Sequence, residues 1–175
     1  VLNYRSKQKK LLESLRNTGL YAKGLIDTDE NGNKFPMDEI DPFSFFSVIM
    51  KFGSPNKNKI FQYLKKEFHI EAELPENYNG VPSSLPTASW VVGYKKDRKP
   101  SDINILWDLF EAALNNKITD KLFTNALNIR LVGFTKLTQG LFWIRPKIYF
   151  PLDKQSKPFL NKHSINCDCV KTETY

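Results

Sequence analysis

The sequence predicts an α+β fold, in which a helix-dominated single domain carries a small β-sheet. Apolar residues recur at helical spacing in several stretches, and the clearest of these is residues 101–114. The stretches in which apolar and polar residues alternate, as they do in strands, are short, and they lie near residues 24–35, 90–95 and 147–152. About six helices and one small sheet follow from these two patterns.

The length and composition fit one domain with a tail. The chain has 175 residues, 41% of them hydrophobic, and its 13 Phe supply enough apolar volume for a core. We expect residues 1–153 to form a single globular domain. Residues 154–175 are polar and basic, and we expect a tail or linker to a module that this sequence lacks.

Capping residues indicate where several helices begin and end. Asp41 stands directly before Pro42, and Thr119 precedes another helical pattern, so both are expected to cap helix N-termini. Arg145 precedes Pro146, which disfavours the helical conformation and ends the helix there. The segment around this end, residues 128–153, is the densest apolar and aromatic run, and we expect a helix followed by a strand.

Residues 27–32, D-T-D-E-N-G, begin like a helix-loop-helix calcium loop. Oxygen-bearing side chains occupy positions one, three and five, and Gly32 occupies position six. The second half fits poorly, because position eight is Lys34, position twelve is Asp38 rather than Glu, and Pro36 interrupts it. Asn-Gly is also a strong hairpin signal, so we expect a plain β-hairpin here and no calcium site.

The charge favours an anionic partner. The chain has 26 Lys and Arg against 19 Asp and Glu, a net charge of +7, which suits nucleic acid or an acidic protein surface. An ordinary protein with a lysine-rich surface has the same composition. The N-terminal residues 5–17 form one basic helical pattern, which we interpret as a surface helix docked by leucines rather than as a phosphate-binding arm.

Several function classes lack support in the sequence. No apolar run is long enough to span a membrane, and the first residues do not resemble a signal peptide, so we expect a cytoplasmic protein. Cys167 and Cys169 are the two cysteines, and they imply no disulfide framework. Their spacing is not usual for zinc, so we expect neither a metal nor a cofactor.

Five ordered pieces of the sequence resemble a known family. They are I-D-P-F-S-F-F at 40–46, G-V-P-S-S-L-P-T-A-S-W at 80–90, Y-K-K-D-R-K-P-S-D-I-N-I-L-W-D-L-F-E-A-A-L at 94–114, L-T-Q-G-L-F-W-I-R-P at 137–146 and F-P-L-D at 150–153. Together they resemble the region that precedes the nucleotidase module of McrB-type restriction proteins.

The resemblance implies a part in modification-dependent or site-specific DNA restriction. In that family, amino-terminal modules recognise DNA, including methylcytosine, an AAA+ GTPase module forms the motor ring, and a separate nuclease subunit cuts. This chain has no G-x-x-x-x-G-K-[ST] loop, so the nucleotide-binding module is absent from it. The resemblance carries over no catalytic residue, and we expect this chain not to be an enzyme.

Residues 129–134 lie between two helical patterns, as in a helix-hairpin-helix element that presents backbone N–H groups to DNA phosphate. Gly133 fits the second glycine of that pattern, but Leu131 stands in place of the first. DNA glycosylases with this element carry an Asp some way after the hairpin, where this chain has Asp153. No catalytic Lys or iron-sulfur cysteines accompany it, so we interpret the segment as a helical turn and Asp153 as a cap or ion-pair partner.

Two functional hypotheses follow. The first is a non-catalytic DNA-binding domain that contacts double-stranded DNA for the motor and nuclease complex. The second is a structural adaptor that packs against the AAA+ ring or the nuclease and touches DNA only through weak charge. For the first, the candidate phosphate contacts are Lys95, Lys96, Arg98, Lys99, Arg145 and Lys147, and the candidate base-stacking residues are Trp90 and Tyr94.

Overall fold

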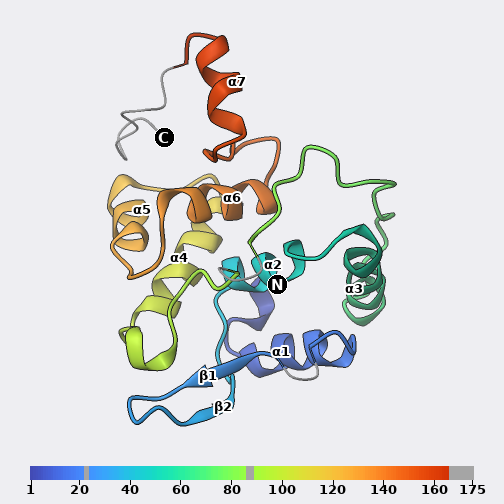
Figure 1. The fold of residues 1–175 in the computed structure, drawn as a ribbon, viewed down its shortest axis with the longest axis vertical. Coiled ribbons are helices and arrows are strands. Elements are labelled where there is room, and N and C mark those ends of the chain that lie inside the picture. Colours follow the sequence, from blue (N-terminus) through green and yellow to red (C-terminus); the bar gives the residue numbers. More distant parts are fainter. Residues whose placement is uncertain (22–23, 86–88, 166–175) are drawn as a thin grey trace.

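The computed structural model describes residues 1–21, 24–85 and 89–165. Helices dominate it, and one small antiparallel sheet completes an α+β domain, as the sequence predicts (Figure 1). In chain order the elements are η1 (Leu2–Tyr4), α1 (Gln8–Asn17), β1 (Ile26–Thr28), β2 (Lys34–Pro36), α2 (Pro42–Met50), α3 (Ser54–Glu67), η3 (Lys95–Asp97), α4 (Asp102–Leu114), α5 (Asp120–Leu127), α6 (Phe134–Ile144) and α7 (Ser156–Lys162).

Helix α2 is the centre of the fold. Its sequence, P-F-S-F-F-S-V-I-M, is apolar on nearly every side, and every residue except Phe46 is buried. A helix that is apolar all round is stable only when other elements cover it. Accordingly α2 contacts α3, α4 and α6, which surround it in Figure 1. The predicted cap is confirmed, since the Asp41 carboxylate accepts a hydrogen bond from Ser44 N at 2.9 Å.

Helices α4, α5 and α6 form a layer on one side of α2, and α3 lies on the other side (Figure 1). The stripe predicted for α4 is buried, with Leu106 and Trp107 fully enclosed. Thr119 caps α5 through Leu122 N, and α6 ends at Arg145 before Pro146, so both predicted boundaries are confirmed. Helix α1 docks through its buried leucines, as expected.

The predicted hairpin at residues 24–35 is confirmed as β1 and β2. Ile26 pairs with Pro36 and Thr28 with Lys34 in antiparallel register. In the turn, the Asp29 carboxylate accepts hydrogen bonds from Asn31 N at 2.9 Å and Asn33 N at 2.8 Å. These bonds stabilise the tight turn.

The other two predicted strands are wrong. Near 90–95, the backbone N–H groups of Val91 and Lys95 donate to the side chains of Ser44 and Asp27 instead of to a neighbouring strand. Two side chains from distant elements thus replace a β-ladder, and residues 95–97 form the 3₁₀ helix η3.

Near 147–152 the alternation is misleading as well. Ile148, Phe150 and Leu152 alternate along the sequence, but Ile148 and Phe150 are 54% and 41% exposed, while Leu152 is buried. The N–H groups of Ile148 and Tyr149 both donate to Arg145 O in a turn, and Leu152 N donates to Thr138 Oγ1.

The described helices continue past residue 153. Helix α7 lies within the segment that the sequence suggested as a tail, and its Leu160 packs with Leu152 and Phe134. Residues 166–175, with both cysteines, lie outside the described part of the chain. No helix within the described ranges is long and apolar enough to cross a membrane.

Gly140 permits the closest approach of α2 and α6. A Cβ atom at Gly140 would lie 2.5 Å from Phe43 Cδ1, and Phe43 is fully buried. We expect Gly140→Ala to lower the free energy of unfolding by about 1–3 kcal/mol through overpacking, although alanine normally favours a helix by about 1 kcal/mol over glycine. Urea denaturation measures this change.

Phe43→Ala supplies the matched background, because it removes the Cγ, Cδ1 and Cε1 atoms that the new methyl group would meet. In that background Gly140→Ala should cost less than in the wild type, since residues in contact are not additive. An equal cost in both backgrounds would show that the Phe43 contact is not the reason for the glycine.

Candidate nucleic-acid interface

The basic residues that the sequence singles out divide into two groups at opposite ends of α4. Lys99 N donates to the Asp102 carboxylate at the start of α4, whereas Arg145 donates to the carbonyls of Ala113 and Leu114 at its end. Twelve residue steps at 1.5 Å separate these ends by about 18 Å. The candidate phosphate contacts therefore do not form one compact patch.

Arg98 has a structural role. Its guanidinium donates to the Asp27 carboxylate at 2.7 Å and to Glu39 at 3.4 Å, and the Arg98 side chain is 5% exposed. Asp27 is fully buried and also accepts from Thr28 N and Lys95 N. This network joins the β1–β2 hairpin to η3, so the Arg98 donors are directed into the protein rather than toward a phosphate.

Arg145 also has a structural role, because oxygen atoms of the protein accept hydrogen bonds from its guanidinium. One guanidinium nitrogen, Nη1, donates to Ala113 O at 3.2 Å, Leu114 O at 3.0 Å and Asn116 Oδ1 at 2.6 Å. The carbonyl groups at a helix C-terminus lack intrahelical partners and carry partial negative charge, so a cation there stabilises the helix end. Arg145 therefore fixes the end of α6 onto the end of α4. Lys147, two residues on, is exposed.

The two candidate stacking residues differ. Trp90 is half-buried and packs against the main core, while its carbonyl accepts from Lys136 Nζ at 2.9 Å. It is thus a core contact rather than a free stacking surface. Tyr94 is 43% exposed directly before η3.

The remaining exposed cations gather around η3 and the turn between α5 and α6. Lys95, Lys96 and Lys99 are exposed. Arg130 comes from the α5–α6 turn, and its guanidinium reaches Asp97 of η3 at 2.7 Å. We call the surface formed by Lys95, Lys96, Lys99 and Arg130 the η3 surface. Arg130 was not among the residues that the sequence analysis selected, although its position between two helical patterns was visible.

The Lys136 side chain of α6 joins the α5–α6 turn to the segment that precedes η3. Lys136 Nζ donates to Leu131 O at 3.2 Å as well as to Trp90 O. Burial lowers the pKa of Lys136, while the charge of nearby Asp41 acts in the opposite direction.

Helix α6 begins after Gly133 with no side chain capping it. Its N-terminal N–H groups and the helix dipole favour an anion next to this turn.

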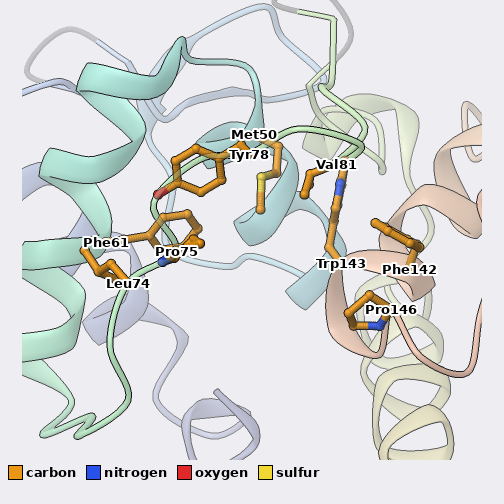
Figure 2. A pocket seen from close by; sticks show the side chains of 9 residues that line it. All are labelled: Met50, Phe61, Leu74, Pro75, Tyr78, Val81, Phe142, Trp143 and Pro146. Carbon is orange, nitrogen blue, oxygen red and sulfur yellow. The ribbon is translucent and has the colours of Figure 1, made fainter.

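A cavity of about 270 Å³ lies on the other side of the molecule, between α3 and the end of α6 (Figure 2). Phe61, Leu74, Pro75 and Tyr78 form one wall, and Phe142, Trp143 and Pro146 form the other, with Met50 and Val81 between them.

The polar ends of its aromatic side chains already have partners. Tyr78 Oη donates to Asn58 Oδ1 at 2.5 Å, and Trp143 Nε1 donates to Pro82 O at 2.9 Å. The cavity therefore offers apolar faces with few polar atoms, and it suits an aliphatic or aromatic group better than the hydrogen-bonding edge of a nucleobase.

Asp153 has the capping role that the sequence suggested. Its Oδ1 accepts from Gln155 N and Ser156 N at the start of α7, and its Oδ2 accepts from Gln139 Nε2 at 3.0 Å. Burial acts to raise the pKa of Asp153, but these hydrogen bonds outweigh it and hold the pKa below its ordinary value. Among the residues that the model describes, no three His, Cys, Asp or Glu side chains are grouped as a metal site would require.

The Arg98–Asp27 pair generates a stability prediction. Arg98→Ala would leave a buried carboxylate without its cation, so the free energy of unfolding should fall by about 3–5 kcal/mol. Lys99→Ala, one residue away on an exposed side chain, should change it by less than about 0.5 kcal/mol. Chemical denaturation of both variants tests this, and equal small effects would contradict the structural role of Arg98.

Comparison with known proteins places the chain in a family. No curated protein and no solved structure matches it. A family model described as a domain of unknown function (DUF8425) matches residues 1–175, the whole chain. The chain therefore belongs to the DUF8425 family.

Proposed function

We propose that this chain is a non-catalytic DNA-binding domain of a McrB-type restriction system. The observation that carries the proposal is the η3 surface, where two segments far apart in sequence bring exposed cations next to the uncapped start of α6. The net charge of +7 and the five sequence pieces that resemble McrB-type proteins support the same function. On this proposal, recognition serves an AAA+ GTPase module and a nuclease subunit carried elsewhere.

The η3 surface suits phosphate contacts for a physical reason. Among the described residues no ion pair holds Lys95 or Lys96, although Lys95 Nζ lies over the Phe35 ring. In the Arg130–Asp97 pair the Arg130 side chain is 67% exposed and the Asp97 side chain 22%. Exposed ion pairs contribute at most about 1 kcal/mol, so Arg130 can exchange Asp97 for a phosphate at little cost. Arg98 and Arg145 are excluded from the contact set, because their donors already stabilise the fold.

An apolar cavity favours the second function, that of an adaptor. The cavity between α3 and α6 could hold one large apolar side chain of a protein partner such as the motor module. Val81→Trp would fill this cavity and should weaken binding to an isolated McrB-type AAA+ module without changing DNA affinity.

The DNA function predicts a specific salt dependence. Fluorescence anisotropy with matched duplexes, unmodified and cytosine-methylated, would measure affinity from about 50 to 200 mM salt. Lys95→Ala, Lys96→Ala and Arg130→Ala should each weaken binding and reduce the slope of log affinity against log salt by about one unit. The wild-type preference between the two duplexes reports whether the domain reads methylation.

Lys59→Ala is the matched control. Lys59 is an exposed lysine on α3, which lies across α2 from α5 (Figure 1). It should leave both affinity and slope unchanged. If all four variants behave alike, charge acts only in bulk and the η3 surface is not the interface. Weak binding that is equal for both duplexes, or none, supports the adaptor.

A further inference from the structure

Leu131, at the tip of the α5–α6 turn, combines two features that disfavour leucine. Its φ angle is +71°, in the left-handed region that glycine adopts more readily, and its side chain is 58% exposed. Among the described residues, four other non-glycine residues have positive φ: Leu25, His69, Asn116 and Ser164. Three of these are polar, and Leu25 is buried in the core. Leu131 is thus the one large apolar side chain held both strained and exposed in that set.

The turn holds the backbone of Leu131 in place beside η3. Ile129 and Val132 on either side are buried, and Val132 N donates to Ile129 O at 3.1 Å. Lys136 Nζ fixes the Leu131 carbonyl. Leu131 Cδ1 would lie 3.5 Å from a Cβ atom at Gly93, so one end of the side chain lies against that glycine, next to Asp97 of η3, while Leu131 as a whole stays 58% exposed.

Arg130 and the short helix η3 bring cations near this apolar residue. Arg130 is adjacent in sequence and pairs with Asp97, and Lys95 and Lys96 belong to the same short helix as Asp97. Proteins that bend DNA use this combination, in which cations hold the phosphates and an apolar side chain enters between base pairs from the minor groove. A partner protein surface would need a wider apolar patch than one side chain.

We propose that Leu131 is a wedge that inserts between two adjacent base pairs, unstacks that step and bends the duplex. The inference rests on the proposed DNA-binding function and adds to it a deformation of the bound DNA. It assigns Leu131 as a positioning residue: Lys95, Lys96 and Arg130 supply the electrostatic attraction, and Leu131 determines the register and shape of the DNA.

The test uses the full chain and a duplex with a single 2-aminopurine, together with the same duplex carrying a fluorophore pair at its ends. Wild-type protein should raise 2-aminopurine fluorescence at saturation and shorten the end-to-end distance. Leu131→Ala should lose both signals and bind more weakly, while its log–log salt slope stays the same, because no phosphate contact is removed.

Leu131→Gly distinguishes loss of the leucine side chain from loss of folding. Glycine relieves the positive-φ strain, so this variant should melt at the same or a higher temperature and still lose the fluorescence and bending signals. Leu131→Met, which keeps an apolar side chain, should retain them. An alanine or glycine variant that unstacks and bends DNA as well as the wild type overturns the wedge.

The outcomes distinguish failure of the wedge from failure of the proposed DNA-binding function. If the wild type binds DNA through the η3 surface but produces neither signal, the wedge is wrong and the DNA-binding function stands. If the wild type binds no duplex at low salt, the DNA-binding function fails and the wedge fails with it.

Discussion

The contact between α2 and α6 is the constraint on which the rest of the structure depends. Phe43 of α2 lies where any side chain at Gly140 of α6 would have to be, so the two helices approach as closely as backbone and ring allow. This contact fixes α6 against the central helix. It thereby positions both ends of α6: the α5–α6 turn beside η3 at its start, and Trp143 beside the apolar cavity at its end.

Several cationic side chains join separate elements of the fold through hydrogen bonds. Arg98 joins the hairpin to η3, Arg145 joins α6 to α4, and Lys136 joins α6 to the segment before η3. Each of these side chains donates to carbonyl or carboxylate oxygens of another segment of the protein. A net charge of +7 therefore overstates the positive charge available to an anionic partner, and the location of the unpaired cations is the better guide.

The two candidate interfaces lie at opposite ends of α6 and differ in chemistry. The η3 surface is cationic and exposed, and Leu131, at positive φ and 58% exposed, lies beside it. The cavity between α3 and α6 is apolar, and hydrogen bonds turn the polar ends of Tyr78 and Trp143 away from it. Under the proposed functions, DNA would lie at one end and a protein partner at the other, because neither surface requires residues of the other.

The sequence by itself determined helices α1 to α6, the caps Asp41 and Thr119 and the hairpin. Those features depend on neighbours within a few residues, as with Asp41 and Ser44 or the Asn-Gly turn after Asp29. The segment at 90–95 could not be assigned in this way, because Ser44 and Asp27 satisfy its N–H groups from 47 and 68 residues away.

Partners distant in sequence also limited the prediction of the candidate nucleic-acid interface. The sequence located the cations but not their partners, and Arg98 and Arg145 find theirs up to 71 residues away. Only the tertiary structure decided which cations are internal and which face solvent, since that choice depends on where distant carboxylates and carbonyls lie. It also brought Arg130 and Leu131 beside η3, because helix packing and not sequence proximity joins the two turns.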